Sequence, residues 1–194
     1  MFMIAVVIHE FAHGWAAYKL GDPTAKYSGR LTLNPLAHVD LYGTIIFPLL
    51  LAFMSHGRFI FGWAKPVPIN YWGLKNPKKD IVWVGLAGPA ANFLLALIVS
   101  GLINLKIMPE ILTVILSMVA AYNLLLGIFN LIPIPPLDGS RVLMGLLPYR
   151  LSEKYVMLEP YGFIILFAMM FLGLTDLVII PVLNLALSLL RIPY

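Results

Sequence analysis

Two histidines and a glutamate interrupt an otherwise apolar stretch near the start of the chain. His9, Glu10 and His13 are the only ionisable side chains between Met1 and Tyr18. A helix over this stretch is about 30 Å long and could cross a bilayer, where three ionisable groups are costly. The i and i+4 spacing puts both imidazoles on one helix face, where they can share a metal ion, and Glu10 is a candidate general base. The pattern predicts an intramembrane zinc hydrolase.

A hydrolytic zinc site needs a third protein ligand and an open position for water. Because the chain has no cysteine, this ligand must be His38, His56 or a carboxylate. Asp138 is the strongest candidate, since it follows an apolar run broken by three prolines. Such a break can turn the carboxylate inward, and Gly139 permits a tight turn after it. A structural turn or a helix cap is the alternative role for Asp138.

The expected chemistry follows from one zinc ion per chain. Zinc lowers the pKa of bound water to about 7, and Glu10 takes the proton and passes it to the leaving amine. Asn130, at the end of the apolar run before Asp138, can donate to the oxyanion, although an amide that bonds between helices is the competing role. The small residues from Gly85 to Asn92 predict close packing against the helix of His9, with Asn92 as an interhelical hydrogen bonder.

The composition predicts an all-α polytopic integral membrane protein in a lipid bilayer. The chain of 194 residues is 61% hydrophobic and 11% charged, whereas soluble domains carry about 25% charged residues. Fifteen prolines and fifteen glycines favour broken or re-entrant segments. The net charge of +4 is better explained by membrane topology than by affinity for nucleic acid, and no nucleic-acid partner is expected.

The distribution of basic residues favours one topology. Apolar runs occupy residues 1–18, 41–55, 81–105, 110–132 and 161–190. The run 41–55 is short, and it either spans the bilayer or dips in and returns. If it is re-entrant, eleven basic residues share one face and Lys106 lies opposite, which the positive-inside rule favours. That face is then cytoplasmic, and the active site opens toward the cytoplasm.

The last run and two connecting segments carry further predictions. The run 161–190 is too long for one crossing and is interrupted at Gly173, Asp176 and Pro181, so either two short segments or one span followed by an interfacial helix fits. The segments 28–35 and 59–70 resemble short strands on the cytoplasmic side of the membrane, and the prolines of the second suit an edge strand.

Three motifs in order resemble the site-2 protease family of intramembrane zinc metalloproteases. They are His9-Glu-Phe-Ala-His13, Ala87-Gly-Pro-Ala-Ala-Asn92 and Asn130-Leu-Ile-Pro-Ile-Pro-Pro-Leu-Asp138-Gly139. The stretches Lys19-Leu-Gly-Asp-Pro-Thr-Ala-Lys and Gly29-Arg-Leu-Thr-Leu-Asn-Pro look like its compact prokaryotic branch, which lacks PDZ and CBS domains. The resemblance runs from about residue 4 to residue 147.

The resemblance implies a three-helix catalytic core with short membrane-associated β segments and extra C-terminal helices. His9, His13 and Asp138 match the family's metal ligands, Glu10 its base, and Asn130 the asparagine proposed to assist the oxyanion. We expect one domain over 1–194, with the core at about 1–147 and the C-terminal helices at about 150–194. The expected location is a prokaryotic cell membrane.

The expected substrates of such a protein are single-span membrane proteins, and a β segment is expected to capture them in extended form. Two other functions fit some of the residues: a metal-binding membrane transporter, and a non-catalytic scaffold for membrane proteins. A transporter would more typically show inverted halves and acidic residues on several helices. The sequence gives no indication of the oligomeric state.

Overall fold

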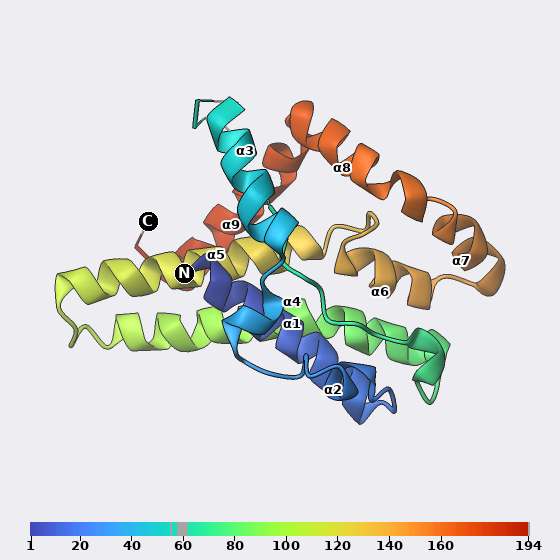
Figure 1. Ribbon diagram of the computed structural model, residues 1–194. Coiled ribbons are helices and arrows are strands. Elements are labelled where there is room, and N and C mark those ends of the chain that lie inside the picture. The colour runs from blue at the N-terminus through green and yellow to red at the C-terminus, as the bar shows by residue number, and fades with distance from the viewer. Residues whose placement is uncertain (55, 58–61, 194) are drawn as a thin grey trace.

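The computed structural model describes residues 1–54, 56–57 and 62–193. Over these residues the chain is helical, as the composition predicted (Figure 1). Its α-helices are α1 (Phe2–Lys19), α2 (Thr24–Tyr27), α3 (Phe47–Met54), α4 (Pro77–Asn104), α5 (Glu110–Asn130), α6 (Asp138–Leu146), α7 (Tyr149–Val156), α8 (Gly162–Phe171) and α9 (Leu174–Leu189). Shorter turns of other helix types lie at Pro35–His38, Leu41–Ile46, Tyr71–Gly73 and Glu159–Tyr161.

Helix α4 is the centre of the fold, because α1, α5 and α6 all pack against it. In Figure 1, α4 and α5 lie side by side and α1 crosses them. Asn76 and Pro77 begin α4, and proline suits this position because its fixed φ fits a helix and the first turn needs no N–H from it. The contacts of α4 bring α1 and α6 together, although 118 residues separate the end of α1 from the start of α6.

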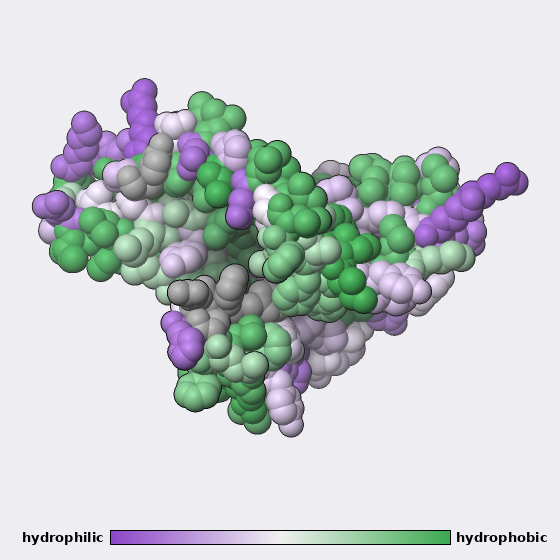
Figure 2. Space-filling model, turned by 90° about the horizontal axis from the view of Figure 1, so that it is seen from above, coloured by the Kyte–Doolittle hydropathy of each residue, from purple (hydrophilic) through white to green (hydrophobic). Residues whose placement is uncertain are grey.

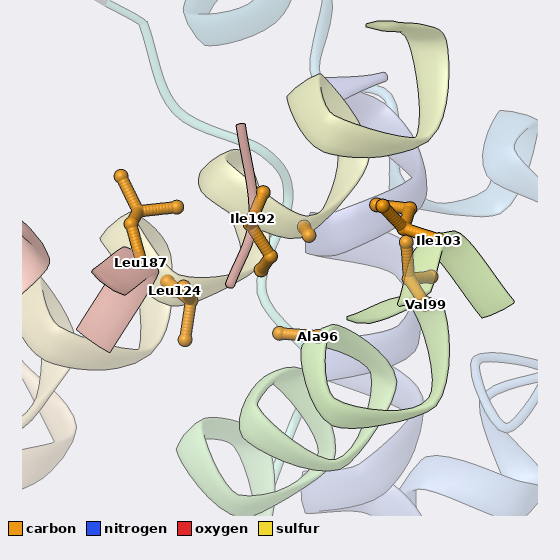
Figure 3. Packing of buried hydrophobic residues seen from close by; sticks show 7 residues of the cluster. Ala96, Val99, Ile103, Leu124, Leu187 and Ile192 are labelled. Carbon is orange, nitrogen blue, oxygen red and sulfur yellow. The ribbon is translucent and has the colours of Figure 1, made fainter. Parts of the chain in front are cut away.

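One end of the α4–α5 pair is held by a purely hydrophobic cluster. Figure 3 shows side chains of α4 and α5 meeting those of α9 and the residues after it. The buried members of the cluster are Ala96, Val99, Ile103, Ala120, Leu124, Leu187 and Ile192. This cluster fixes the relative positions of α4 and α5, so the other half of the pair can carry polar groups.

Many large apolar side chains are exposed on the surface, more than is usual for a water-soluble protein. Phe53 of α3, Trp72 and Phe171 are 85%, 89% and 92% exposed, and α3 has no buried residue. Figure 2 shows hydrophobic residues over much of one face, with strongly hydrophilic side chains gathered toward the two ends of the molecule. Exposed apolar area of this extent fits lipid contact. Among the described residues, three helical segments are long and apolar enough to cross a membrane: Pro77–Asn104, Glu110–Asn130 and Tyr149–Phe171.

The apolar runs 41–55 and 161–190, whose membrane topology the sequence left open, form different structures. The run predicted at 41–55 is a π-helical turn followed by α3, and together Leu41–Met54 is shorter than a spanning helix needs. The run predicted at 161–190 becomes two helices separated at Gly173, whose φ of +69° is left-handed and suits glycine. Asp176 and Pro181 do not interrupt this run, because both lie inside α9.

The predicted β segments are wrong, because no strand forms in the part of the chain that the structure describes. Residues 28–34 form turns, bends and irregular backbone, and Phe59 to Phe61 of the second segment lie outside the described residues. Residues 62–70 have no regular secondary structure; we call them the strap. Pro66 and Pro68 supply no N–H for a ladder, and other strap groups bond elsewhere: Lys65 N donates to the backbone of His38.

Candidate metal centre

Helix α1 supplies two imidazoles whose Nε2 atoms face each other. His9 and His13 are one helical turn apart, both are buried, and their Nε2 atoms lie 3.0 Å apart. The i and i+4 spacing produces this proximity directly, because such residues share one helix face. The sequence therefore determines half of the site without help from the rest of the fold.

The carboxylate of Asp138 meets both imidazoles. Its Oδ2 lies 2.9 Å from Nε2 of His9 and 3.1 Å from Nε2 of His13. Asp138 is the first residue of α6, directly after the N-cap residue Leu137. The three residues are the group whose ligand atoms could hold a metal ion among the described residues.

The hydrogen-bond partners of His9 and His13 determine which ring nitrogen of each carries the proton. Nδ1 of His9 lies 2.6 Å from the Asn92 side-chain oxygen, and Nδ1 of His13 lies 2.7 Å from the carbonyl oxygen of Val84. Each Nδ1 must therefore carry the proton when the imidazoles are neutral, and each Nε2 presents a lone pair. Two lone pairs and a carboxylate oxygen facing one another repel unless a cation lies among them.

The spacing of the three ligand atoms suits a small divalent ion. Tetrahedral zinc sites with ligands at 2.0–2.2 Å place neighbouring donor atoms about 3.3–3.6 Å apart. The separations of 2.9–3.1 Å between His9, His13 and Asp138 are only slightly tighter. Nitrogen and carboxylate donors are also the ligands zinc uses when cysteine is absent. The residues present therefore fit zinc.

Two glycines make room for this geometry. A Cβ on Gly88 of α4 would lie 2.3 Å from Nε2 of His13 and 2.7 Å from Nε2 of His9. A Cβ on Gly139 would lie 2.2 Å from the carbonyl oxygen of Leu131. The expected tight turn at Gly139 is wrong: this glycine is helical, and it is required because α6 begins against the backbone of the preceding loop.

Glu10 is held by the strap. Its Oε2 accepts a hydrogen bond of 2.7 Å from the backbone N–H of Val67, which lies between two prolines. The buried Arg30 holds the same piece of chain, since its Nη2 donates to the carbonyl oxygens of Lys65 at 2.6 Å and Pro66 at 3.2 Å. No motif in the sequence singled out Arg30, because only the fold brings it to the strap.

Asn130 and Asn92 occupy different surroundings. Asn130 is the last residue of α5, and its Nδ2 donates to the carbonyl oxygen of Leu126 at 3.0 Å. Asn92 is fully buried between α4, α1 and α5, as the predicted interhelical role requires. The amide of Asn123, which the sequence did not single out, bonds to Asn92 at 2.7 Å.

The partly buried Tyr71 lies beside the ion pair of Arg141 and Glu159. Arg141 lies 5.2 Å above the ring of Tyr71 and forms an ion pair with Glu159. Burial raises the pKa of the Tyr71 hydroxyl, and the positive charge of Arg141 opposes that rise. Tyr71 is therefore neutral at physiological pH.

Comparisons with known proteins agree with this geometry. The model of peptidase family M50 matches residues 1–110 and 101–173. YwhC of Bacillus subtilis, a candidate zinc metalloprotease by name, is 39% identical over 94% of this chain and 83% of its own length. Rip2 of Mycolicibacterium smegmatis is 31% identical over 84% of this chain and 62% of its own length. The zinc metalloprotease MJ0392 of Methanocaldococcus jannaschii is 29% identical over 80% of this chain and 34% of its own length. No solved structure gives a significant match.

Proposed function

Because this chain belongs to peptidase family M50, the site-2 protease family, and is a zinc metalloprotease, we propose that it hydrolyses peptide bonds of single-span membrane proteins within or just below the bilayer. Proteins of this family act on membrane proteins. The family match extends over residues 1–173. The chain is an integral membrane protein.

One observation carries the proposal: the ligand atoms of His9, His13 and Asp138 converge to within 2.9–3.1 Å of one another. These residues would hold one zinc ion, which supplies a Lewis acid and lowers the pKa of water when bound. Three protein ligands leave a coordination position open, as catalytic zinc sites require. Charged and polar groups this close together among apolar helices are otherwise costly.

Glu10 would move the proton. One carboxylate oxygen is held by Val67 N–H, which leaves the other free to accept a proton from the attacking water. Glu10 then donates that proton to the nitrogen of the leaving amine. The N–H of Asn130 that does not bond to Leu126 would stabilise the oxyanion, because an amide has two donors.

The substrate must present an extended backbone at the site. A transmembrane substrate is helical, and its carbonyl groups are engaged until the helix unwinds. Basic residues cluster around the end of α1 and the loops before α4 and after α6, and the positive-inside rule makes that side cytoplasmic. The site would therefore open toward the cytoplasm.

The test is cleavage of a tethered single-span substrate in lipid vesicles, with zinc content measured in parallel. Glu10→Gln should keep zinc and lose cleavage by about 10²-fold or more, and a chelator should abolish cleavage by the unchanged protein. Glu153→Gln, a substitution at an exposed position of α7, is the matched control and should cleave normally. Cleavage that survives Glu10→Gln would exclude Glu10 as base, and metal flux without cleavage would favour a transporter.

A further inference from the structure

Two buried asparagines connect His9 to a backbone carbonyl inside α5. Asn92 on α4 and Asn123 on α5 are both 0% exposed. Nδ2 of Asn123 donates to the carbonyl oxygen of Val119 at 2.8 Å, and Oδ1 of Asn123 accepts from Nδ2 of Asn92 at 2.7 Å. Nδ2 of Asn92 also donates to the carbonyl oxygen of Ala5 at 3.1 Å. Oδ1 of Asn92 lies 2.6 Å from Nδ1 of His9.

This chain of hydrogen bonds has only one consistent orientation. The carbonyl of Val119 belongs to a helix backbone, so it cannot rotate and can only accept. Turning the amide of Asn123 would place its oxygen against that carbonyl oxygen. Turning the amide of Asn92 would place its oxygen against two acceptors, those of Asn123 and Ala5. Each of these arrangements leaves buried polar groups unpaired, which is costly.

The orientation of the amides determines which nitrogen of His9 carries the proton. Asn92 presents an acceptor to His9, so Nδ1 is protonated and the lone pair lies on Nε2, 2.9 Å from Oδ2 of Asp138. His13 needs no such chain, because its Nδ1 faces the carbonyl of Val84, which cannot turn. The two imidazoles are thus oriented by different means, one by a backbone carbonyl and one by a rotatable amide.

We propose that Asn123 is a positioning residue that fixes the tautomer of His9 through Asn92 and so keeps the Nε2 lone pair available for the metal. This inference rests on the metal site of the proposed function. Without Asn123, only Ala5 still bonds to Nδ2 of Asn92, and the amide can turn its NH₂ group toward His9. Nδ1 then accepts, Nε2 takes the proton, and His9 cannot bind a metal. Loss of such outer-shell support typically lowers metal affinity by about 10–100-fold.

The test reads the tautomer directly in metal-free protein. The full chain is labelled with ¹⁵N-histidine and placed in lipid nanodiscs, where its four histidines give few enough ring signals to assign. In the unchanged protein we expect a proton on Nδ1 of both His9 and His13, whether or not Nε2 also carries one beside Asp138. Asn123→Leu should give a tautomer mixture at His9 alone, while His13 in the same molecule stays unchanged. Zinc affinity, measured by competition with a chelating dye, should fall by about 10–100-fold.

Two further variants separate orientation from packing. Asn123→Asp should restore both readouts, because a protonated carboxyl can donate to Val119 and accept from Asn92 as the amide does. Ser117→Ala removes another buried polar group of α5, whose hydroxyl bonds to nothing among the described residues, and should change neither readout. If Asn123→Leu does not accumulate in membranes, Asn123→Ala takes its place, because the smaller alanine side chain cannot clash with the neighbouring helices.

An unchanged His9 tautomer in the leucine or alanine variant, with zinc affinity equal to that of Ser117→Ala, would overturn the inference. The result is independent of proteolysis, because neither readout requires a substrate. Failure of the proposed function would appear elsewhere, as cleavage that persists in Glu10→Gln or as zinc binding that does not depend on Asp138.

Discussion

The backbone N–H of Val67 donates a hydrogen bond of 2.7 Å to Oε2 of Glu10, which joins the strap to the residue beside both imidazoles. Val67 is buried, and Gly14 of α1 leaves space for its side chain. A hydrogen bond to a carboxylate fixes the direction of its second oxygen as well as the first. Glu10 is therefore oriented by a segment 57 residues away in the sequence.

Replacing Val67 by proline removes this donor at a position that already lies between two prolines. Hydrogen bonds to charged groups contribute about 1.5–3 kcal/mol, so we expect kcat to fall by about 10–100-fold with zinc content unchanged. Val67→Ala keeps the N–H and is the control, which should retain most of kcat. Equal kcat in the two variants would show that the hydrogen bond does not orient Glu10.

Replacing Arg30 by methionine should loosen the strap. The change leaves the carbonyl oxygens of Lys65 and Pro66 without their buried donor, at a cost of about 1–3 kcal/mol. The amide of Val67 should then exchange with deuterium about tenfold faster or more, as measured by mass spectrometry of peptides over 62–70. Lys154→Met, an exposed change on α7, should leave exchange there unchanged. Slow exchange in both variants would mean that Arg30 does not hold the strap.

Gly88→Ala should disrupt the metal centre. The added Cβ would overlap the imidazoles of both His9 and His13, so the rings must shift and zinc affinity should fall by at least about tenfold. Gly101→Ala lies on the same helix with no described atom within 4 Å of its new Cβ. It should keep zinc and stabilise α4 by about 0.5–1 kcal/mol. Normal zinc affinity in Gly88→Ala would contradict the arrangement of α1 against α4.

Asp138→Asn should reduce zinc affinity while leaving the fold intact. The neutral amide has nearly the shape of the carboxylate but lacks the charge that zinc ligation uses, so we expect a loss of at least about tenfold, measured by dye competition. Asp176→Asn, exposed in the first turn of α9, is the control. If both variants bound zinc like the unchanged protein, Asp138 would not be a ligand.

Local patterns in the sequence were enough to predict parts of the molecule that depend on neighbouring residues. The helix of His9 and His13 follows from an apolar run, and their shared face follows from helix periodicity. The end of α5 before Asp138 follows from three prolines, because proline cannot continue a helix. The composition likewise predicted a helical membrane protein, which the fold and the family comparison confirm.

The strap shows why the β segments were predicted wrongly. Its β-branched and proline-punctuated residues have the local preferences of an edge strand. Whether an extended segment becomes a strand depends on a partner strand, and that is a tertiary property. Here the side chains of Glu10, Arg30 and Asp22 form hydrogen bonds with the strap's backbone groups instead.

The sequence by itself determined which residues could form a metal site and which local helices carry them, because helix spacing and proline breaks act over a few residues. Only the tertiary structure decided how His9 meets Asp138, why Gly88 must lack a side chain, and which amides orient the imidazole. These depend on α4 packing between α1 and α6 and on α5 packing beside it. The contacts span from 31 to more than 120 residues of chain, and packing over such separations leaves no periodic signal in the sequence.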